Sequence, residues 1–326
     1  MRVVAVKRYG DPEVLEVREM PDPQVNSGEV LIRVKSVGVN FADLMQRMGI
    51  YPGVPKPPFV PGFEVAGVVE KVGDGGRSGD SVDFRPGDAV CAITQYNASA
   101  QWVAVSARQV YRLPAGMPFE DGAALPVNYM TAYHAMFAMG KLQSGDRILI
   151  HGAAGGVGIA AIQGARIAGA AEIVAVDMVD SKLKDALRFG ATMGVKPDEL
   201  GTANAEINGP AGGFDYAFEC IGLPETIRAA YDAARRGGTA VIVGAGSNEK
   251  NVEFNCFELF FMEKKLLGSY YGSADVRTEF SRLIRLWKSG RLDLEGMISS
   301  RMDLSKAQDA FDAMKKGEII RQILTF

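Results

Sequence analysis

Residues 147–158 read RILIHGAAGGVG: a short apolar run, a seven-residue turn containing four glycines, and the start of a second apolar stretch. A strand followed by a glycine-rich turn and a helix is the context in which a dinucleotide loop occurs. Small residues let the backbone approach a pyrophosphate, whose charge is met by N–H groups at the helix N-terminus. The glycines would also suit a merely tight turn, but the flanks favour binding through Gly155, Gly156, Val157 and Gly158.

One acidic residue closes the next β-rich run, EIVAVD at 172–177, and lies 19 residues beyond Gly158. The acid that holds the adenosine ribose in dinucleotide-binding folds follows the glycine loop by about 20 residues. A carboxylate there accepts both ribose hydroxyls and repels a 2′-phosphate. Asp177 therefore predicts NAD(H), with NADP(H) kept as an alternative. Asp177 also fits as a helix N-cap residue.

Outward from this loop, β-rich runs alternate with helical patterns, which is typical of a doubly wound parallel sheet. We expect strands at 147–150, 173–176, 216–219, 240–243 and 266–270, and helices at 157–168, 181–188 and 224–235. Before residue 110 the chain shows only short strands, which favours a small barrel-like β domain. These strands are expected at 3–6, 14–18, 30–37, 65–72, 89–93 and 102–105. The fold class is α/β, with two domains.

Composition excludes several classes of function. The 326 residues carry a net charge of −3, with 36 basic and 39 acidic side chains interspersed, which disfavours nucleic acid as a partner. The charge-free stretches 122–140 and 148–165 hold polar residues or glycines and do not suit a membrane. Three scattered cysteines and a charged N-terminus predict a cytoplasmic protein without disulfides. The two histidines, His134 and His151, are taken as structural.

Three segments carry a resemblance to the medium-chain dehydrogenase/reductase superfamily over nearly the whole chain. Residues 145–158, with Gln163 and Arg166, resemble the quinone oxidoreductase/zeta-crystallin signature, as do 40–51 and 125–133. From about residue 172 the chain is more similar to the zinc alcohol dehydrogenases. The resemblance implies a GroES-like β-barrel domain from residues 1–121 and 275–326, and a Rossmann domain from 122–274. It also implies a homodimer.

The same resemblance suggests further site residues. Lys182 would join Asp177 at the ribose and Arg321 would reach the pyrophosphate, although both also fit as surface charges. Asn128 and Thr131 would approach the nicotinamide, or cap a helix. Backbone groups of Gly244 and Ala245 would hold the carboxamide. The aromatic run 257–261 fits a domain or subunit contact.

Zinc is not expected, because the positions of its ligands hold Asn40-Phe41-Ala42-Asp43 and Gly62-Phe63-Glu64. An amide and a phenyl ring replace the thiolate and imidazole that a tetrahedral zinc site needs. Without a Lewis acid to stabilise an alkoxide, oxidation of an alcohol is difficult. Reduction of a quinone or an enone is easier, because conjugation spreads the negative charge that develops on the acceptor.

We therefore expect hydride transfer from a nicotinamide cofactor to a quinone or α,β-unsaturated carbonyl between the domains. Asn40 and Tyr51 are the expected donors to the substrate carbonyl. Asn40 also fits as a loop-stabilising residue, and Tyr51 as an apolar wall. Two alternatives stay open: an alcohol or aldehyde dehydrogenase-like protein that has lost its metal, and a non-catalytic nucleotide-binding protein, crystallin-like or regulatory.

Overall fold

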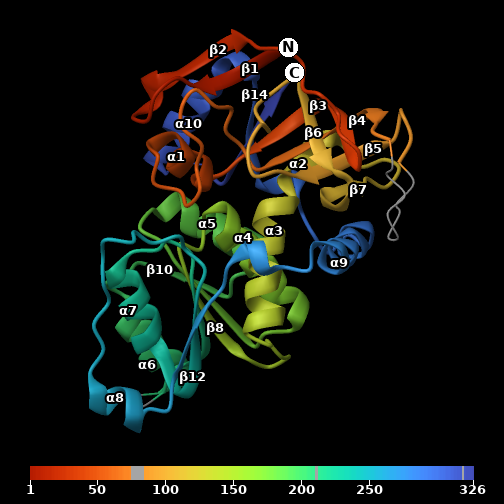
Figure 1. Ribbon diagram of the computed structural model, residues 1–326. Coiled ribbons are helices and arrows are strands. Elements are labelled where there is room, and N and C mark those ends of the chain that lie inside the picture. The colour runs from red at the N-terminus through yellow and green to blue at the C-terminus, as the bar shows by residue number, and fades with distance from the viewer. Residues whose placement is uncertain (75–83, 210–211, 318) are drawn as a thin grey trace. The chain divides into compact units, whose positions relative to one another are not determined.

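A computed structural model describes residues 1–74, 84–209, 212–317 and 319–326 (Figure 1). The chain divides into two compact units. Unit 1 comprises Met1–Val127 with Leu294–Phe326, and unit 2 comprises Asn128–Asp293. The chain thus passes between units after Val127 and Asp293, rather than after residues 121 and 274, and the helix at 276–288 falls in unit 2.

Unit 1 is built on a seven-stranded sheet in which strands from both ends of the described chain are neighbours. The order is β14-β15-β3-β4-β5-β7, with β6 also paired to β3, and β1 and β2 form a separate antiparallel pair. The strands are β1 (Arg2–Val6), β2 (Leu15–Glu19), β3 (Glu29–Val39), β4 (Glu64–Val72), β5 (Ala89–Ile93), β6 (Trp102–Ser106), β7 (Val110–Arg112), β14 (Ile298–Asp303) and β15 (Arg321–Thr325). The helices are α1 (Phe41–Met48), α2 (Phe119–Ala124) and α10 (Ala307–Lys316).

Successive side chains of a strand point to opposite faces of the sheet, and in β3 and β4 one face is apolar. Its valines, such as Val30, Val65 and Val69, are at most 1% exposed. They join Leu304, Phe311 and Leu324 from the far end of the sequence in one apolar core. Unit 1 therefore needs both segments to bury its sheet.

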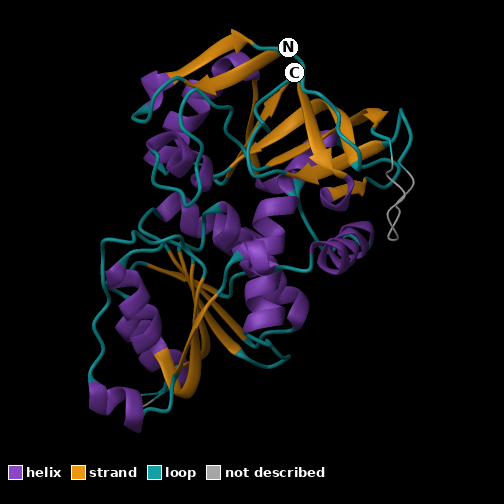
Figure 2. Cartoon of the chain, viewed as in Figure 1, coloured by secondary structure: helices purple, strands orange, loops and turns teal. Residues whose placement is uncertain are grey.

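Unit 2 is a six-stranded sheet in which every pairing is parallel, in the order β10-β9-β8-β11-β12-β13. This is the doubly wound order 3-2-1-4-5-6. Helices cover both faces of the sheet (Figure 2). The strands are β8 (Arg147–His151), β9 (Glu172–Val176), β10 (Met193–Val195), β11 (Phe214–Glu219), β12 (Ala234–Ile242) and β13 (Lys265–Gly268). The helices are α3 (Pro126–Tyr133), which begins at the unit boundary, α4 (Gly156–Ala168), α5 (Asp180–Phe189), α6 (Leu200–Asn208), α7 (Pro224–Ala233), α8 (Cys256–Phe261) and α9 (Val276–Lys288).

Burial on both faces accounts for the continuous apolar runs of β8 and β9, because such strands have no solvent-facing side. Leu149 and Val174 are fully buried. In a sheet of this kind, ligands bind at the carboxyl ends of the strands. The candidate site residues of unit 2 all follow such strand ends or lie on α3, α4 and α5.

Candidate nucleotide and reaction site

The glycine-rich loop links β8 to α4 in the predicted way. Gly152 has a φ of +68°, and its N–H and that of Ala153 donate to the Val176 carbonyl of β9 at 3.1 and 3.2 Å. Gly155 is the N-cap residue of α4, with φ −83° and ψ 172°. The first N–H groups of a helix have no intrahelical acceptor. Those of Gly156, Val157 and Gly158 therefore could bind an anion at the carboxyl edge of the sheet.

The distance from each loop glycine to its neighbours shows which of these glycines are required for packing. A Cβ on Gly158 would lie 2.3 Å from the Gly152 carbonyl oxygen, and one on Gly156 would lie 2.6 Å from Asn128 Nδ2. A Cβ on Gly155 would meet nothing closer than 3.5 Å. A Cβ at 155 would thus make only an ordinary van der Waals contact, which leaves room beside the loop for an external group such as a pyrophosphate.

Asp177 lies directly beyond β9 and beside this loop. Its Oδ2 accepts a hydrogen bond from the Ala154 N–H at 3.2 Å, and its Oδ1 accepts one from the Met178 N–H at 2.9 Å. Each carboxylate oxygen keeps a second lone pair for a ribose hydroxyl. Lys182 lies half-buried in the first turn of α5. The sequence thus places loop, acid and lysine in one region of unit 2.

Three apolar side chains near these strand ends were missed by sequence reasoning. Met178 is 79% exposed, and Ile221 and Leu223, just beyond β11, are each 39% exposed. Large apolar groups exposed beside a polar site suit the faces of an aromatic base. A signal was present in the sequence, since an apolar residue directly follows Asp177, but exposure can be read only from the fold.

Further along the same edge lie the residues expected near a nicotinamide. Asn128 and Thr131, on α3, are 5% and 8% exposed. Gly244 and Ala245 follow β12, but the Gly244 N–H already donates to the Glu219 carbonyl at 2.9 Å. The Gly244 N–H is therefore engaged within the protein, and the predicted carboxamide contact would use the Gly244 carbonyl or the Ala245 backbone.

In unit 1, Asn40, Asp43, Glu64 and Arg321 form a buried cluster, each at most 5% exposed. Asn40 Nδ2 donates to Glu64 Oε1 at 2.7 Å, and Asn40 Oδ1 accepts from Arg321 Nη1 at 2.7 Å. The Arg321 guanidinium also pairs with Glu64 and donates to the carbonyls of Val39 and Ala123, at 2.8 and 3.0 Å.

Asp43 Oδ2 accepts the Asn40 backbone N–H at 2.8 Å. Burial, with a smaller contribution from the nearby Glu64 carboxylate, raises the pKa of Asp43 to about 8. The cluster thus ties the end of β3 and the start of α1 to β4 and β15.

These contacts change the interpretation of two expected site residues. The Asn40 amide is engaged inside the protein, so its role as a donor to substrate stays a prediction that the geometry does not favour. Arg321 is 1% exposed and surrounded by protein oxygens, where a pyrophosphate contact was expected. Tyr51 is half-buried, with its ring edge-on to Phe63 at a centroid distance of 5.0 Å.

The same region does not fit a zinc ion. Asn40 is held by Glu64 and Arg321, and Phe63 contributes no ligand atom. Over the described residues, no group of three or more His, Cys, Asp or Glu side chains could hold a metal. The three cysteines, Cys91, Cys220 and Cys256, are unpaired. The described part of the chain also has no helix long and apolar enough to cross a membrane.

Comparisons with known proteins agree with this architecture. Residues 26–132 match the alcohol dehydrogenase GroES-like domain, and residues 156–289 match the zinc-binding dehydrogenase family. Human quinone oxidoreductase is 30% identical over 325 residues, which cover 97% of this chain and 94% of that protein. The chain belongs to the medium-chain dehydrogenase/reductase superfamily. The expected GroES-like and Rossmann folds are confirmed.

Other known proteins match in part of the sequence or in fold. A synaptic vesicle membrane protein VAT-1 homolog from Danio rerio is 43% identical over 164 residues, which make up 50% of this chain and 33% of that protein. The chain thus spans about a third of that relative's length. Escherichia coli quinone oxidoreductase complexed with NADPH superposes with a TM-score of 0.88 at 24% identity, covering 100% of both chains.

Proposed function

We propose that this protein is a metal-independent reductase that transfers hydride from a nicotinamide dinucleotide to a quinone or an α,β-unsaturated carbonyl. One observation carries most of the proposal: Gly155 is uncrowded at the α4 N-terminus, where a Cβ would meet nothing closer than 3.5 Å, and Asp177 is bonded to the same loop. The confirmed oxidoreductase superfamily supports it, as does the similarity to human quinone oxidoreductase.

Each group of residues has a distinct task in this proposal. The α4 N-terminus binds the pyrophosphate, Asp177 and Lys182 bind the ribose, and Met178 and Ile221 pack against the base. When bound, the nicotinamide supplies the hydride. Tyr51 donates to the substrate carbonyl, which stabilises negative charge as it develops on oxygen. Asn40, hydrogen-bonded to Glu64 and Arg321, holds the start of α1 in place and does not contact the substrate.

The cofactor is proposed to be NADH, because a carboxylate at the ribose repels a 2′-phosphate. The bound NADPH named for the Escherichia coli enzyme makes NADPH the alternative. The test is oxidation of NADH and NADPH, side by side, with a quinone and an enone, in the presence of a chelator. We expect turnover with NADH, insensitive to chelation, and an Asp177→Asn variant whose kcat/KM for NADH falls at least tenfold relative to that for NADPH.

A second candidate is a protein that binds nucleotide without catalysis, since the loop and Asp177 would hold a nucleotide whether or not a reaction follows. Nucleotide binding with no turnover of any acceptor would support it. Activity lost on chelation would instead indicate a metal-dependent dehydrogenase. The three unpaired cysteines suit the cytoplasm as the proposed compartment.

We also propose that two copies associate through the β13 edge of unit 2. β13 ends the sheet and pairs with β12 alone among the described strands, and Leu266 on it is 42% exposed. An unpaired strand edge is a template for pairing with a second chain. Next to it, α8 exposes Phe257, Phe260 and Phe261, by 67%, 75% and 48%.

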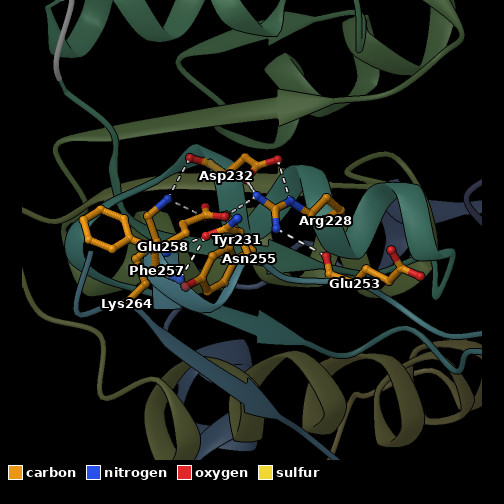
Figure 3. Close-up of polar contacts among 8 residues, drawn as sticks. All are labelled: Arg228, Tyr231, Asp232, Glu253, Asn255, Phe257, Glu258 and Lys264. Carbon is orange, nitrogen blue, oxygen red and sulfur yellow. Dashed lines mark hydrogen bonds and ion pairs between the residues drawn. The ribbon is translucent and has the colours of Figure 1, made fainter. Parts of the chain in front are cut away.

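A polar network joins α8 to α7 and to the segments that flank α8 (Figure 3). Arg228 on α7 bonds Asp232 and Glu258, each at 2.6 Å, and the Glu253 carbonyl at 3.3 Å. Lys264 donates to the carbonyls of Tyr231 and Asp232 at 2.9 and 3.1 Å. Asn255 caps the helix by accepting from the N–H groups of Phe257 and Glu258. Apolar rings exposed on a firmly anchored helix are typical of an interface.

A further inference from the structure

A buried imidazole–carboxylate pair lies in unit 2. His134 begins the π-helical turn after α3, and its Nδ1 lies 3.1 Å from Oε1 of Glu279 on α9. The side chains are 8% and 7% exposed. A carboxylate bonded to one ring nitrogen fixes the orientation of an imidazole and leaves the other nitrogen for chemistry. This arrangement is unlike that of a histidine that only fills space.

Three polar atoms of this region are buried without a hydrogen-bond partner in the described structure: His134 Nε2, Glu279 Oε2 and Ser269 Oγ. Burying a polar atom without a partner is costly, so each such atom calls for an explanation. A hollow of about 430 Å³ lies here, and its walls include His134, Met139, Ile242, Ser269 and Tyr270. We call it the His134 hollow. Apolar walls with a few polar points are typical of a site for a small ring compound.

The His134 hollow lies at the edge of the sheet where the proposed nicotinamide contacts are. Ile242 and Gly268 are the last residues of β12 and β13 and pair in register. Ala245 follows β12 by three residues, and Thr131 precedes His134 by one helical turn. The pair and the hollow belong wholly to unit 2, as do these contacts.

We propose that His134, oriented by Glu279, is the acid that protonates the reduced acceptor at this hollow. The inference rests on the proposed function. With a nicotinamide bound, hydride transfer would break its C–H bond and form a C–H or O–H bond on the acceptor, leaving an enolate or a hydroquinone anion. The Nε2–H bond of His134 would then break as a C–H or O–H bond forms on the product. The nicotinamide would be oxidised and the acceptor reduced, and His134 would take its next proton from water.

The test compares His134→Asn with wild-type protein. The asparagine amide lies where Nδ1 does, so it keeps the bond to Glu279 and removes Nε2. Because a general acid contributes 10²- to 10⁴-fold, we expect kcat to fall about 100-fold or more, with an unchanged Kd for the nucleotide. Glu279→Gln is expected to lower kcat about tenfold. Lys288→Gln, an exposed charge-to-amide change on the same helix, is the matched control and is expected to change nothing.

A second measurement needs no nucleotide and no turnover. Phenol resembles an enol, with one O–H on a flat apolar ring, and we expect His134→Asn to raise its Kd for the full chain about tenfold. Support requires the lower kcat, the unchanged nucleotide Kd and the weaker phenol binding together. An active wild type with any of these three missing overturns the role of His134 alone. A wild type that reduces no acceptor with either nucleotide overturns the proposed function, and this role with it.

Discussion

Gly155 and Gly158 are three residues apart, but only Gly158 is required by the packing of the loop. A methyl group on Gly158 would lie 2.3 Å from the Gly152 carbonyl oxygen, whereas one on Gly155 would lie 3.5 Å from that oxygen, an ordinary van der Waals contact. We expect Gly158→Ala to destabilise the fold by about 2 kcal/mol or more, since the clash is with backbone. Gly155→Ala should destabilise the fold by no more than about 1 kcal/mol, because glycine is a moderately good N-cap residue and alanine a poor one.

Gly155→Ala should affect nucleotide binding more than it affects stability. We expect Gly155→Ala to weaken nucleotide affinity at least tenfold, because its methyl group occupies space assigned to the pyrophosphate. Thermal unfolding and nucleotide titration of both variants check this. A Gly155→Ala protein that binds nucleotide as wild type does would mean that the pyrophosphate does not lie beside residue 155.

Asp43 makes stability depend on pH in an unusual direction for an acid. Its pKa is raised to about 8 in the folded protein, chiefly by burial, against 3.8 for the ordinary carboxyl. Between these values the folded state keeps a proton that the unfolded chain releases, so stability falls as pH rises towards 8. The slope is at most about 1.4 kcal/mol per pH unit.

We expect Asp43→Asn to lose this dependence, which urea unfolding at pH 6.5, 7.25 and 8 would measure. In that window His151, whose pKa is lowered by burial to about 4, is neutral in the folded state; its smaller effect has the opposite sign and is the same in wild type and Asp43→Asn. Asp309→Asn, on the exposed face of α10, is the control. Equal slopes for wild type and Asp43→Asn would contradict a proton held on Asp43.

At the level of single residues, sequence reasoning found the loop glycines and Asp177, because local order along the chain defines them. It assigned Asn40 and Arg321 to ligand contacts, since nothing in the letters shows that residues 281 positions apart hydrogen-bond each other. His134 looked structural for the same reason: its partner Glu279 lies 145 residues away.

Among the elements, strands with strong apolar runs were predicted within a residue or two, and β5 was predicted with the bounds it has. β12 begins at Ala234, not at 240, because the pairing with β11 shifts register between Phe214 and Tyr216. The predicted helix at 224–235 is also two residues too long, since α7 ends at Ala233. The three-residue strands β7 and β10 carry too few residues for a period to show.

The anchoring of α8 predicts a local effect. Arg228 joins α7 to Glu258 on α8, and its guanidinium lies 5.3 Å from the Phe254 ring centre. We expect Arg228→Met to speed hydrogen exchange of the 257–261 amides about tenfold, because α8 loses its charged attachment to α7. Arg188→Met, which removes an exposed pair with Asp185 on α5, should leave α8 unchanged. Equal exchange in both variants would mean that the network of Figure 3 does not hold the helix.

On the scale of the whole molecule, the proposed pairing through β13 predicts a change of mass. We expect sedimentation of the wild type at twice 35.0 kDa. Phe257→Glu combined with Phe260→Glu should shift it to a single chain, since charges would then be buried against a partner. Tyr9→Glu, an exposed aromatic of unit 1, is the control. A wild type that sediments as one chain at micromolar concentration would contradict the pairing.

The position of β15 between β14 and β3 has a consequence for synthesis on the ribosome. Arg321 bonds the Val39 carbonyl across 282 residues of sequence, so β3 leaves the ribosome long before its neighbour exists. At 5–20 residues per second that interval is roughly 15 to 60 s. Until then Glu64 and Asn40 lack their hydrogen bonds to the Arg321 guanidinium. Unit 2, continuous in sequence, can form first, and a nascent chain halted before residue 321 would carry an exposed β3 edge suited to capture by a chaperone.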